Sequence, residues 1–121
     1  MADNLNRNEM SLELGGEKYV LRASFEAISG IENDLGSIMA LAEKYSAGTI
    51  KLSEIVAIVY HGLRGYVGYS AKEPLSKARI GEALLERGAV QAMLDTMHFP
   101  AMAMNGVSLG KPQQPQPEQA S

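Results

Sequence analysis

The densest run of apolar residues lies between Lys51 and Gly65, in the sequence KLSEIVAIVYHGLRG. Its apolar side chains recur at helical spacing and cover more than one narrow stripe. Ser53 is the expected N-cap, and Gly65 is the expected C-terminal stop. A helix with this much apolar surface requires cover on several sides, so we expect the other elements to pack around it. The core-facing residues in this prediction are Ile55, Val56, Ile58, Val59 and Leu63.

Before this helix, apolar and polar residues alternate in two short runs on either side of Gly15 and Gly16. Such alternation places the apolar side chains on one face of a β-strand. A two-residue type I′ turn needs positive φ at both central positions, which glycine adopts without steric cost. The pattern therefore predicts a β-hairpin, which must lie on helices because two strands alone are marginally stable. The alternating apolar positions are Met10, Leu12, Leu14, Tyr19 and Leu21.

Four further helices are predicted, each from apolar residues at helical spacing between a capping residue and a glycine or proline. They run from Ser24 to Gly36, from Ser37 to Gly48, from Pro74 to Gly88, and from Ala89 to a break expected at Pro100. The glycine-broken stretch from Tyr66 to Ser70 is predicted to be a loop. The first of these helices is expected to bury Phe25, Ile28, Ile31 and Leu35, and the last Val90, Met93, Leu94 and Met97.

Together the elements predict an α+β fold that is mostly α, with an N-terminal two-stranded β-hairpin followed by about five short helices packed around the central apolar helix. At 121 residues the chain has room for one domain. We expect a flexible polar arm over residues 1–8, a single globular domain over residues 9–105, and a disordered Pro/Gln-rich tail over residues 106–121.

Composition narrows the class of protein. With 45 % hydrophobic and 21 % charged residues, the chain is typical of soluble globular proteins. Its formal net charge of −3 argues against binding nucleic acid through phosphate contacts, which need a basic surface. The sequence has no cysteine, which excludes disulfides and thiolate chemistry. It also shows neither a bilayer-spanning run nor the apolar core of a signal peptide, so we expect a cytoplasmic protein.

No arrangement of residues in the sequence is typical of catalysis. Neither His61 nor His98 lies in a zinc-binding motif, so we expect packed or surface imidazoles. The glycines from Gly62 to Gly68 follow a predicted helix rather than a strand, which does not match a phosphate-binding loop. The pair Glu82 and Glu86 is expected to belong to a solvated charged face. We therefore expect a protein that is not an enzyme and that holds no cofactor or metal.

Tyrosines and methionines gather near the end of the central helix and in the C-terminal segment, respectively. Core filling is one interpretation and is favoured for Met93 and Met97, whereas Met102 and Met104 lie beyond Pro100 and are harder to bury. The other interpretation is a surface for a partner or for a second copy of the chain, since thioethers and tyrosines are common at adaptable interfaces. The candidate partner-binding residues are Tyr60, Tyr66, Tyr69, Phe99, Met102 and Met104.

Four stretches follow one another in a characteristic order: Leu12 to Arg22, with the sequence LELGGEKYVLR; Phe25 to Gly36, which begins FEAISGIE; Leu41 to Gly48; and Leu52 to Gly65. Their order and spacing resemble the gene transfer agent and phage tail assembly chaperone family, whose genes lie among the tail genes of alphaproteobacterial prophages. The resemblance extends over most of the predicted domain, to about Met97.

The resemblance implies a non-enzymatic chaperone that binds a tape-measure or tail-tube protein during tail assembly, in the cytoplasm of the bacterial host and without a membrane. Homo-oligomerisation remains open. The alternative, from another class, is a small regulatory or adaptor protein. An adaptor that associates with nucleic acid is unexpected from the acidic charge.

Overall fold

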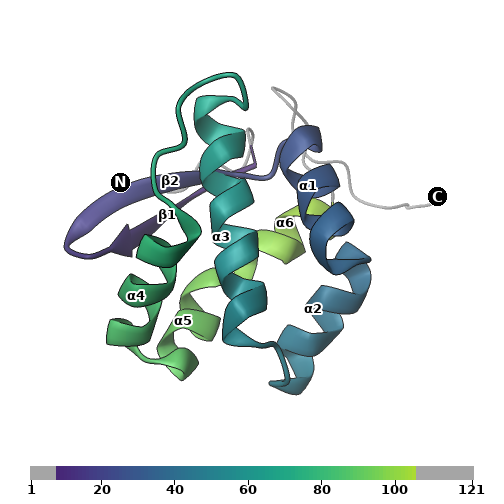
Figure 1. Ribbon diagram of the computed structural model, residues 1–121. Helices are drawn as coiled ribbons and strands as arrows, with labels where there is room; N and C mark the ends of the chain where they lie inside the picture. The colour runs from purple at the N-terminus through teal and green to yellow at the C-terminus, as the bar shows by residue number, and fades with distance from the viewer. Residues whose placement is uncertain (1–7, 106–121) are drawn as a thin grey trace.

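The structure, a computed structural model, describes residues 8–105 of the chain. This part contains two strands and six helices (Figure 1). They are β1 (Glu9–Leu14), β2 (Glu17–Arg22), α1 (Phe25–Leu35), α2 (Ile38–Ala47), α3 (Leu52–Val67), α4 (Lys77–Arg87), α5 (Ala89–Thr96) and α6 (His98–Asn105). The predicted α+β, mostly α class with an N-terminal hairpin is confirmed.

The hairpin has the predicted turn. β1 and β2 pair antiparallel with Leu14 opposite Glu17, so the two glycines between them form the loop. Gly15 and Gly16 have φ angles of 58° and 84°, and both are positive as a type I′ turn requires. One face of the hairpin is buried, through Met10, Leu12, Leu14 and Leu21.

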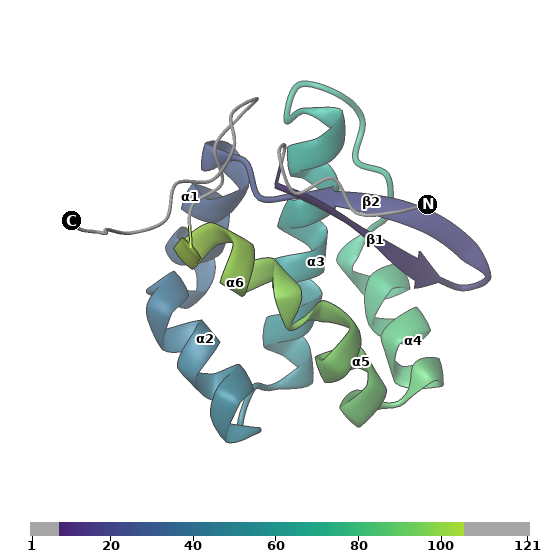
Figure 2. The ribbon, with the colours of Figure 1, turned by 180° about the vertical axis from the view of Figure 1, so that it is seen from behind.

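The helix α3 is the central element, as predicted. It contacts β2, α1, α4 and α5. Two opposite views show it running through the middle of the molecule, with α1 and α2 on one side and α4 and α5 on the other (Figures 1 and 2). The helix α6 lies against α2, which closes the core on the remaining side. The core residues of α3 are Ile55, Ala57, Ile58, Val59 and Leu63.

The predicted start of α3 is wrong. The helix begins at Leu52, so Ser53 lies inside it and Lys51 is the N-cap residue. Glu54, in the first turn, makes a different capping contact: its carboxylate accepts the backbone N–H of the N-cap residue Lys51 at 2.9 Å. The same carboxylate accepts a charged hydrogen bond from Lys44 Nζ at 2.6 Å. A carboxylate in the first turn also interacts favourably with the helix dipole, which explains why the serine is not needed.

The predicted end of α3 is also wrong. The helix continues through Gly65 and stops at Gly68, which has a φ of 96°. Tyr66 and Val67 are therefore helical rather than part of a loop. Gly65 serves a different purpose, because a Cβ at this position would lie 2.5 Å from the backbone oxygen of Arg22. The glycine lets α3 and β2 approach closely.

The helices α1 and α2 are capped by Ser24 and Ser37 as predicted. Within α1, however, the inward positions are Ala27 and Ile31, both fully buried. Phe25 is 86 % exposed, so its predicted burial is wrong. It lies two residues before Ala27 and thus about 200° around the helix axis from the buried face.

The predicted start of α4 at Pro74 is wrong as well. The helix begins at Lys77, and the hydroxyl of Ser76 caps it by accepting the backbone N–H of Arg79 at 3.2 Å. Pro74 lies in the loop between α3 and α4. Ser76 is the better start because its hydroxyl accepts a free backbone N–H of the first turn. Proline has a φ suited to the first turn but has no side-chain acceptor. The predicted end at Gly88 is confirmed.

The helix α5 turns an unexpected face to the core. Its buried residues are Ala92 and Thr96, both fully inaccessible. Val90, Leu94 and Met97, predicted to be buried, are 69 %, 47 % and 41 % exposed. The small side chain of Ala92 permits close packing on the neighbouring helices, and Thr96 is satisfied by hydrogen bonds, so the larger apolar residues face outward.

The predicted break of the last helix is present, but it lies at Met97 rather than at Pro100, and a sixth helix begins at His98. Pro100 lies in the first turn of α6, where its missing N–H leaves no bond unmade. The new helix direction brings Phe99 and Met102 into the core, with exposed fractions of 0 % and 6 %. The expectation that Met102 is hard to bury is therefore wrong.

The predicted arm and tail lie outside the described residues, except for Asn8. The backbone oxygen of Asn8 accepts the N–H of Ala23 at 2.8 Å, which extends the hairpin pairing by one bond. None of the helices within residues 8–105 is long and apolar enough to cross a membrane.

Candidate partner-binding surfaces

Two of the predicted tyrosines belong to a polar cluster at the C-terminal end of α3. His61 lies at its centre and is buried. Its Nε2 is 2.8 Å from the Asp34 carboxylate on α1, and its Nδ1 is 2.6 Å from the Tyr69 hydroxyl. Because a carboxylate can only accept, Nε2 carries a proton, and in the neutral imidazole Nδ1 accepts the hydrogen bond that Tyr69 donates. We call His61, Asp34, Tyr69, Arg64 and Tyr60 the histidine cluster.

Arg64 ties the loop after α3 to the histidine cluster. Its guanidinium donates to the backbone oxygen of Tyr69 and, at 3.1 Å, to the hydroxyl of Tyr60. It also lies 4.8 Å from the centre of the Tyr69 ring, in cation–π geometry. Polar bonds therefore fix the loop to the helix end, although the buried Nε of Arg64 has no hydrogen-bond partner.

The pKa values in the histidine cluster follow from these contacts. The hydrogen bond from His61 is the main cause of a lowered pKa at Asp34, and Lys77, with its Nζ 3.7 Å away, acts in the same direction. Burial raises the pKa of Tyr69 to about 12 despite the nearby charge of Arg64. Tyr69 is thus held in its protonated form at neutral pH, which suits a hydrogen-bond donor and not an activated nucleophile.

The exposed residues of α5 form a second kind of surface. Val90 and Leu94 share one face of α5 at i and i+4, and Met97, the C-cap residue that follows the helix, continues this face at i+7. Met104, on α6, is 45 % exposed. We call these four residues the apolar stripe. Exposed apolar residues gathered on one face are uncommon on monomers and mark interaction sites.

A groove adjoins the apolar stripe between α2 and α6. Figure 2 shows these two helices side by side on the face opposite to that of Figure 1. The groove has a volume of about 220 Å³. Apart from Ser46 and Asn105, its walls carry apolar or aromatic side chains. The lining residues are Ala42, Tyr45, Ser46, Met97, Pro100, Ala101, Met104 and Asn105.

A buried hydrogen bond fixes the floor of the groove. The hydroxyls of Tyr45 and Thr96 lie 2.8 Å apart and join α2 to α5. Thr96 donates its proton to the backbone oxygen of Ala92 at 2.8 Å, so the bond between the two hydroxyls is donated by Tyr45. Burial raises the pKa of Tyr45 to about 12, which keeps this donor protonated. The groove is therefore formed before anything binds.

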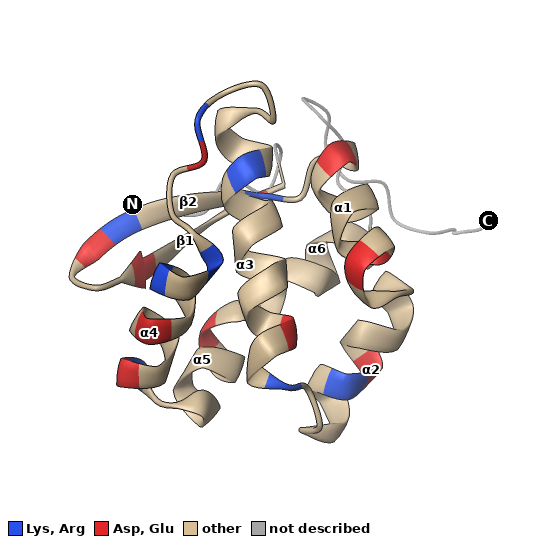
Figure 3. Cartoon of the chain, viewed as in Figure 1, with Lys and Arg blue, Asp and Glu red and all other residues tan. Residues whose placement is uncertain are grey.

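The region around the apolar stripe is almost free of charge. Between Gly88 and Asn105, Asp95 is the single Asp, Glu, Lys or Arg residue. Burial raises the pKa of Asp95, but hydrogen bonds from Arg87 and Gln91 outweigh it, and the net pKa is lowered. Its charge is thus compensated within the chain. Most other charged side chains of the described residues lie on α1, α2, α4, the hairpin and the loops (Figure 3).

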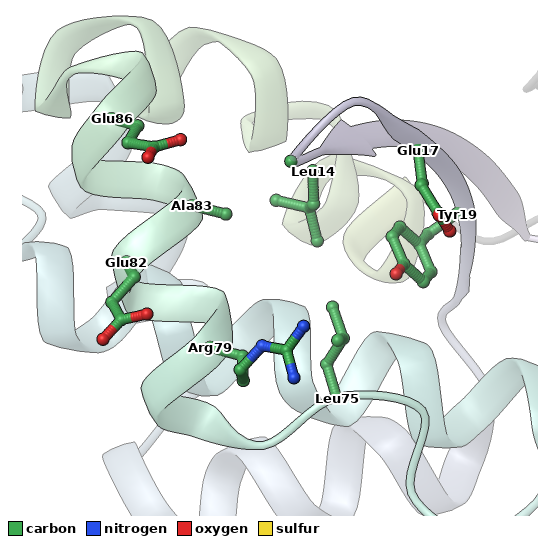
Figure 4. A pocket seen from close by; sticks show the side chains of 9 residues that line it. Leu14, Glu17, Tyr19, Leu75, Arg79, Glu82, Ala83 and Glu86 are labelled. Atoms are coloured by element: carbon green, nitrogen blue, oxygen red, sulfur yellow. The ribbon is translucent and has the colours of Figure 1, made fainter.

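A second cavity lies between the hairpin tip and α4 and has a volume of about 380 Å³. Figure 4 shows Leu14 and Tyr19 of the hairpin facing Leu75 and Arg79 across it. Three carboxylates, of Glu17, Glu82 and Glu86, complete its rim. Within residues 8–105, no three His, Asp or Glu side chains are grouped so that they could hold a metal ion.

The structure separates the six residues proposed from sequence into three groups. Tyr60 and Tyr69 are half-buried in the histidine cluster, and Tyr66 beside them is 48 % exposed. Phe99 and Met102 are core residues and cannot contact a partner in this conformation, since other residues of the chain cover them. Met104 alone lies on the apolar stripe. The stripe residues of α5 were missed because their helical spacing predicts a core face.

A small α+β domain with a preformed apolar groove and an uncovered apolar stripe has the features of a protein-binding module. The chain matches the family described as "Phage tail tube protein, GTA-gp10" over residues 7–97. It therefore belongs to this gene transfer agent and phage tail family, and its role is connected with the tail. Neither the curated proteins nor the solved structures that were compared contain a match. The family match ends where α5 gives way to α6.

Proposed function

We propose that the chain acts in tail assembly as a non-enzymatic chaperone that binds a tape-measure or tail-tube protein in the cytoplasm of the bacterial host. The observation that carries this proposal is the apolar stripe. Val90, Leu94 and Met97 are large, exposed and adjacent on one helix face, and their exposure has a cost in water of roughly 25 cal/mol for each Å². A partner that covers them would remove this cost.

The surroundings of the stripe support a protein partner over other ligands. Methionine is adaptable, and charged residues are depleted at the centres of protein interfaces, as they are between Gly88 and Asn105. The groove is mostly apolar, which does not favour nucleotides or other anions. In the histidine cluster, the raised pKa of Tyr69 does not favour an activated hydroxyl.

The family description favours a second candidate function, in which the chain is itself a subunit of the tail tube. The two functions differ in whether the chain is part of the finished particle. A tube subunit is present in many copies in every finished particle, whereas an assembly chaperone leaves. Mass spectrometry of purified particles distinguishes them. Absence or trace amounts of the chain support the chaperone, and stoichiometric amounts support the tube subunit.

Co-expression tests the binding surface. The tagged full chain is expressed with the tape-measure or the tail-tube protein of the same tail gene cluster, and capture is measured. We expect the double variant Val90→Ser/Leu94→Ser to lose capture while its circular dichroism spectrum is unchanged. Phe25→Ser, at the most exposed large apolar residue of α1, is the matched control and should retain capture.

Tyr66→Ser examines the competing surface at the end of α3. Loss of capture in this variant alone, with the stripe variant still binding, would move the interface to the tyrosine region. Loss in neither variant would contradict binding through the stripe.

A further inference from the structure

We propose that the occupant of the groove and the apolar stripe is an amphipathic α-helix whose docking face carries no charge. The inference rests on the proposed tail-assembly function and specifies the partner segment. It depends on three properties of the surface: its shape, the state of its backbone groups and its lack of charge.

The surface is elongated. From Val90 to Met104 the exposed apolar positions follow the course of α5 and α6, and the groove lies beside them. Each of these two helices has eight residues and is roughly 12 Å long, or about two turns. A helix that packs in a groove presents side chains at i, i+3, i+4 and i+7, and such a row matches a surface of this length. The groove volume of about 220 Å³ allows large side chains of the row to enter between α2 and α6.

The backbone of the surface selects against an extended partner. The walls come from α2, from α6 and from Met97 just before α6, and the interior N–H and C=O groups of the two helices are bonded within each helix. An extended segment needs a free strand edge to pair with, and neither strand lines this groove. Its own backbone groups would be buried without partners on an apolar wall, at a substantial cost in free energy. A helix satisfies these groups internally and meets no such cost.

The charge of the surface selects the docking face of that helix. Asp95 is compensated by Arg87 and Gln91, and residues 96–105 contain no Asp, Glu, Lys or Arg. A charged side chain on the docking face would lose its hydration against lining residues that carry no charge. An uncharged face of leucine, alanine or methionine loses only unfavourable contact with water. An uncharged docking face on the partner helix therefore fits the uncharged surface of this chain.

Model peptides test the proposal on the full chain. The first probe is a designed amphipathic helix of about five turns, with Leu and Ala on one face and Gln and Ser on the other. The second has the same composition in an alternating, strand-like order. The third is the first helix with two Leu on the docking face changed to Lys, and a fourth has them changed to Glu. Binding is followed by amide shifts in the ¹⁵N-labelled protein.

We expect the first peptide to shift amides of Ala42, Ser46, Ala101 and Asn105, and to bind at least about tenfold more tightly than the other three, a difference of about 1.4 kcal/mol. Its affinity should be unchanged between about 0.05 M and about 0.5 M salt, since no ion pair forms. Leu94→Ser should weaken binding, and Phe25→Ser should not.

Equal or tighter binding of the strand-like or charged peptides would overturn the inference. So would a dimer of the free chain that Leu94→Ser dissociates, because a second copy would then be the occupant. If none of the peptides binds while the stripe variant still abolishes capture of the tail protein, this inference fails and the proposed function stands. If no peptide binds and the stripe variant still captures the tail protein, both this inference and the proposed binding through the stripe are contradicted.

Discussion

The histidine cluster and the apolar stripe present residues of the kind found at interfaces, yet they differ in how their atoms are used. In the histidine cluster both nitrogens of His61 and the hydroxyl of Tyr69 are hydrogen-bonded within the chain. In the apolar stripe, Val90 and Leu94 remain 69 % and 47 % exposed. A concentration of tyrosine or methionine in the sequence therefore does not locate a free surface. What locates it is whether the side chains already have partners.

The largest expected change in stability distinguishes the buried side of α6 from its exposed side. Phe99→Ala empties a fully buried site and should lower the free energy of unfolding by about 3–5 kcal/mol. Met104→Ala, on the exposed side, should change it by less than about 0.5 kcal/mol. Urea denaturation measures both. Similar values for the two variants would show that α6 is not packed on one face.

A smaller loss should follow from Gly65→Ala. The new Cβ would lie 2.5 Å from the backbone oxygen of Arg22, and a backbone atom cannot rotate away. We expect a loss of about 1–3 kcal/mol by thermal denaturation. The control is Gly81→Ala, in α4, where the nearest atom would be 3.7 Å away. That change should be neutral or stabilising by up to about 1 kcal/mol, because alanine is the better helix former.

The histidine cluster is broken most directly by Tyr69→Phe. The variant leaves the buried Nδ1 of His61 without its hydrogen-bond partner. We expect the free energy of unfolding to fall by about 1–3 kcal/mol, together with faster amide exchange in the loop after α3. Tyr66→Phe is the matched control at an exposed tyrosine of the same region and should change stability by less than about 0.5 kcal/mol. If the two variants behave alike, the bond to His61 contributes little.

The smallest effect concerns pH. The pKa of Asp34 is lowered in the folded chain, so its contribution to stability is present above the unfolded value of about 3.8 and is lost as the pH falls below it. Asp34→Asn should therefore flatten the acid side of the stability curve. The pKa of Tyr69 is raised to about 12, so its contribution is present below about pH 10 and is lost as the pH rises through about 12. Tyr69→Phe should flatten the alkaline side, leaving the similar loss from Tyr45.

Local patterns predicted those parts of the fold that depend on local chemistry. The Gly15-Gly16 turn and the glycine stops after α1, α2 and α4 follow from backbone conformations that few residues adopt. The serine caps of α1 and α2 follow from hydroxyls that accept free backbone N–H groups. The central position of α3 follows from its apolar content. These features do not depend on which neighbour the chain meets.

The remaining features depend on neighbours far along the chain. Gly65 was predicted to stop α3 because the same residue type serves for helix ends and for close packing, and only the position of Arg22 decides between them. The inward face of α5 was missed because Thr96 is buried through its bond to Tyr45, 51 residues earlier. The bonds from His61 to Asp34 and Tyr69 likewise join residues that no local spacing relates.

The close contact between α3 and β2 fixes the rotation of α3 about its own axis. Gly62 faces Leu21 and Gly65 faces Arg22, so two positions one turn apart must both lack a side chain. Inserting one residue between them would rotate everything that follows by about 100° and turn a side chain toward the strand. The rest of α3 would have to unwind or the hairpin would have to detach. Changes in length should therefore be tolerated in the loop after Gly68 and rejected between these two glycines.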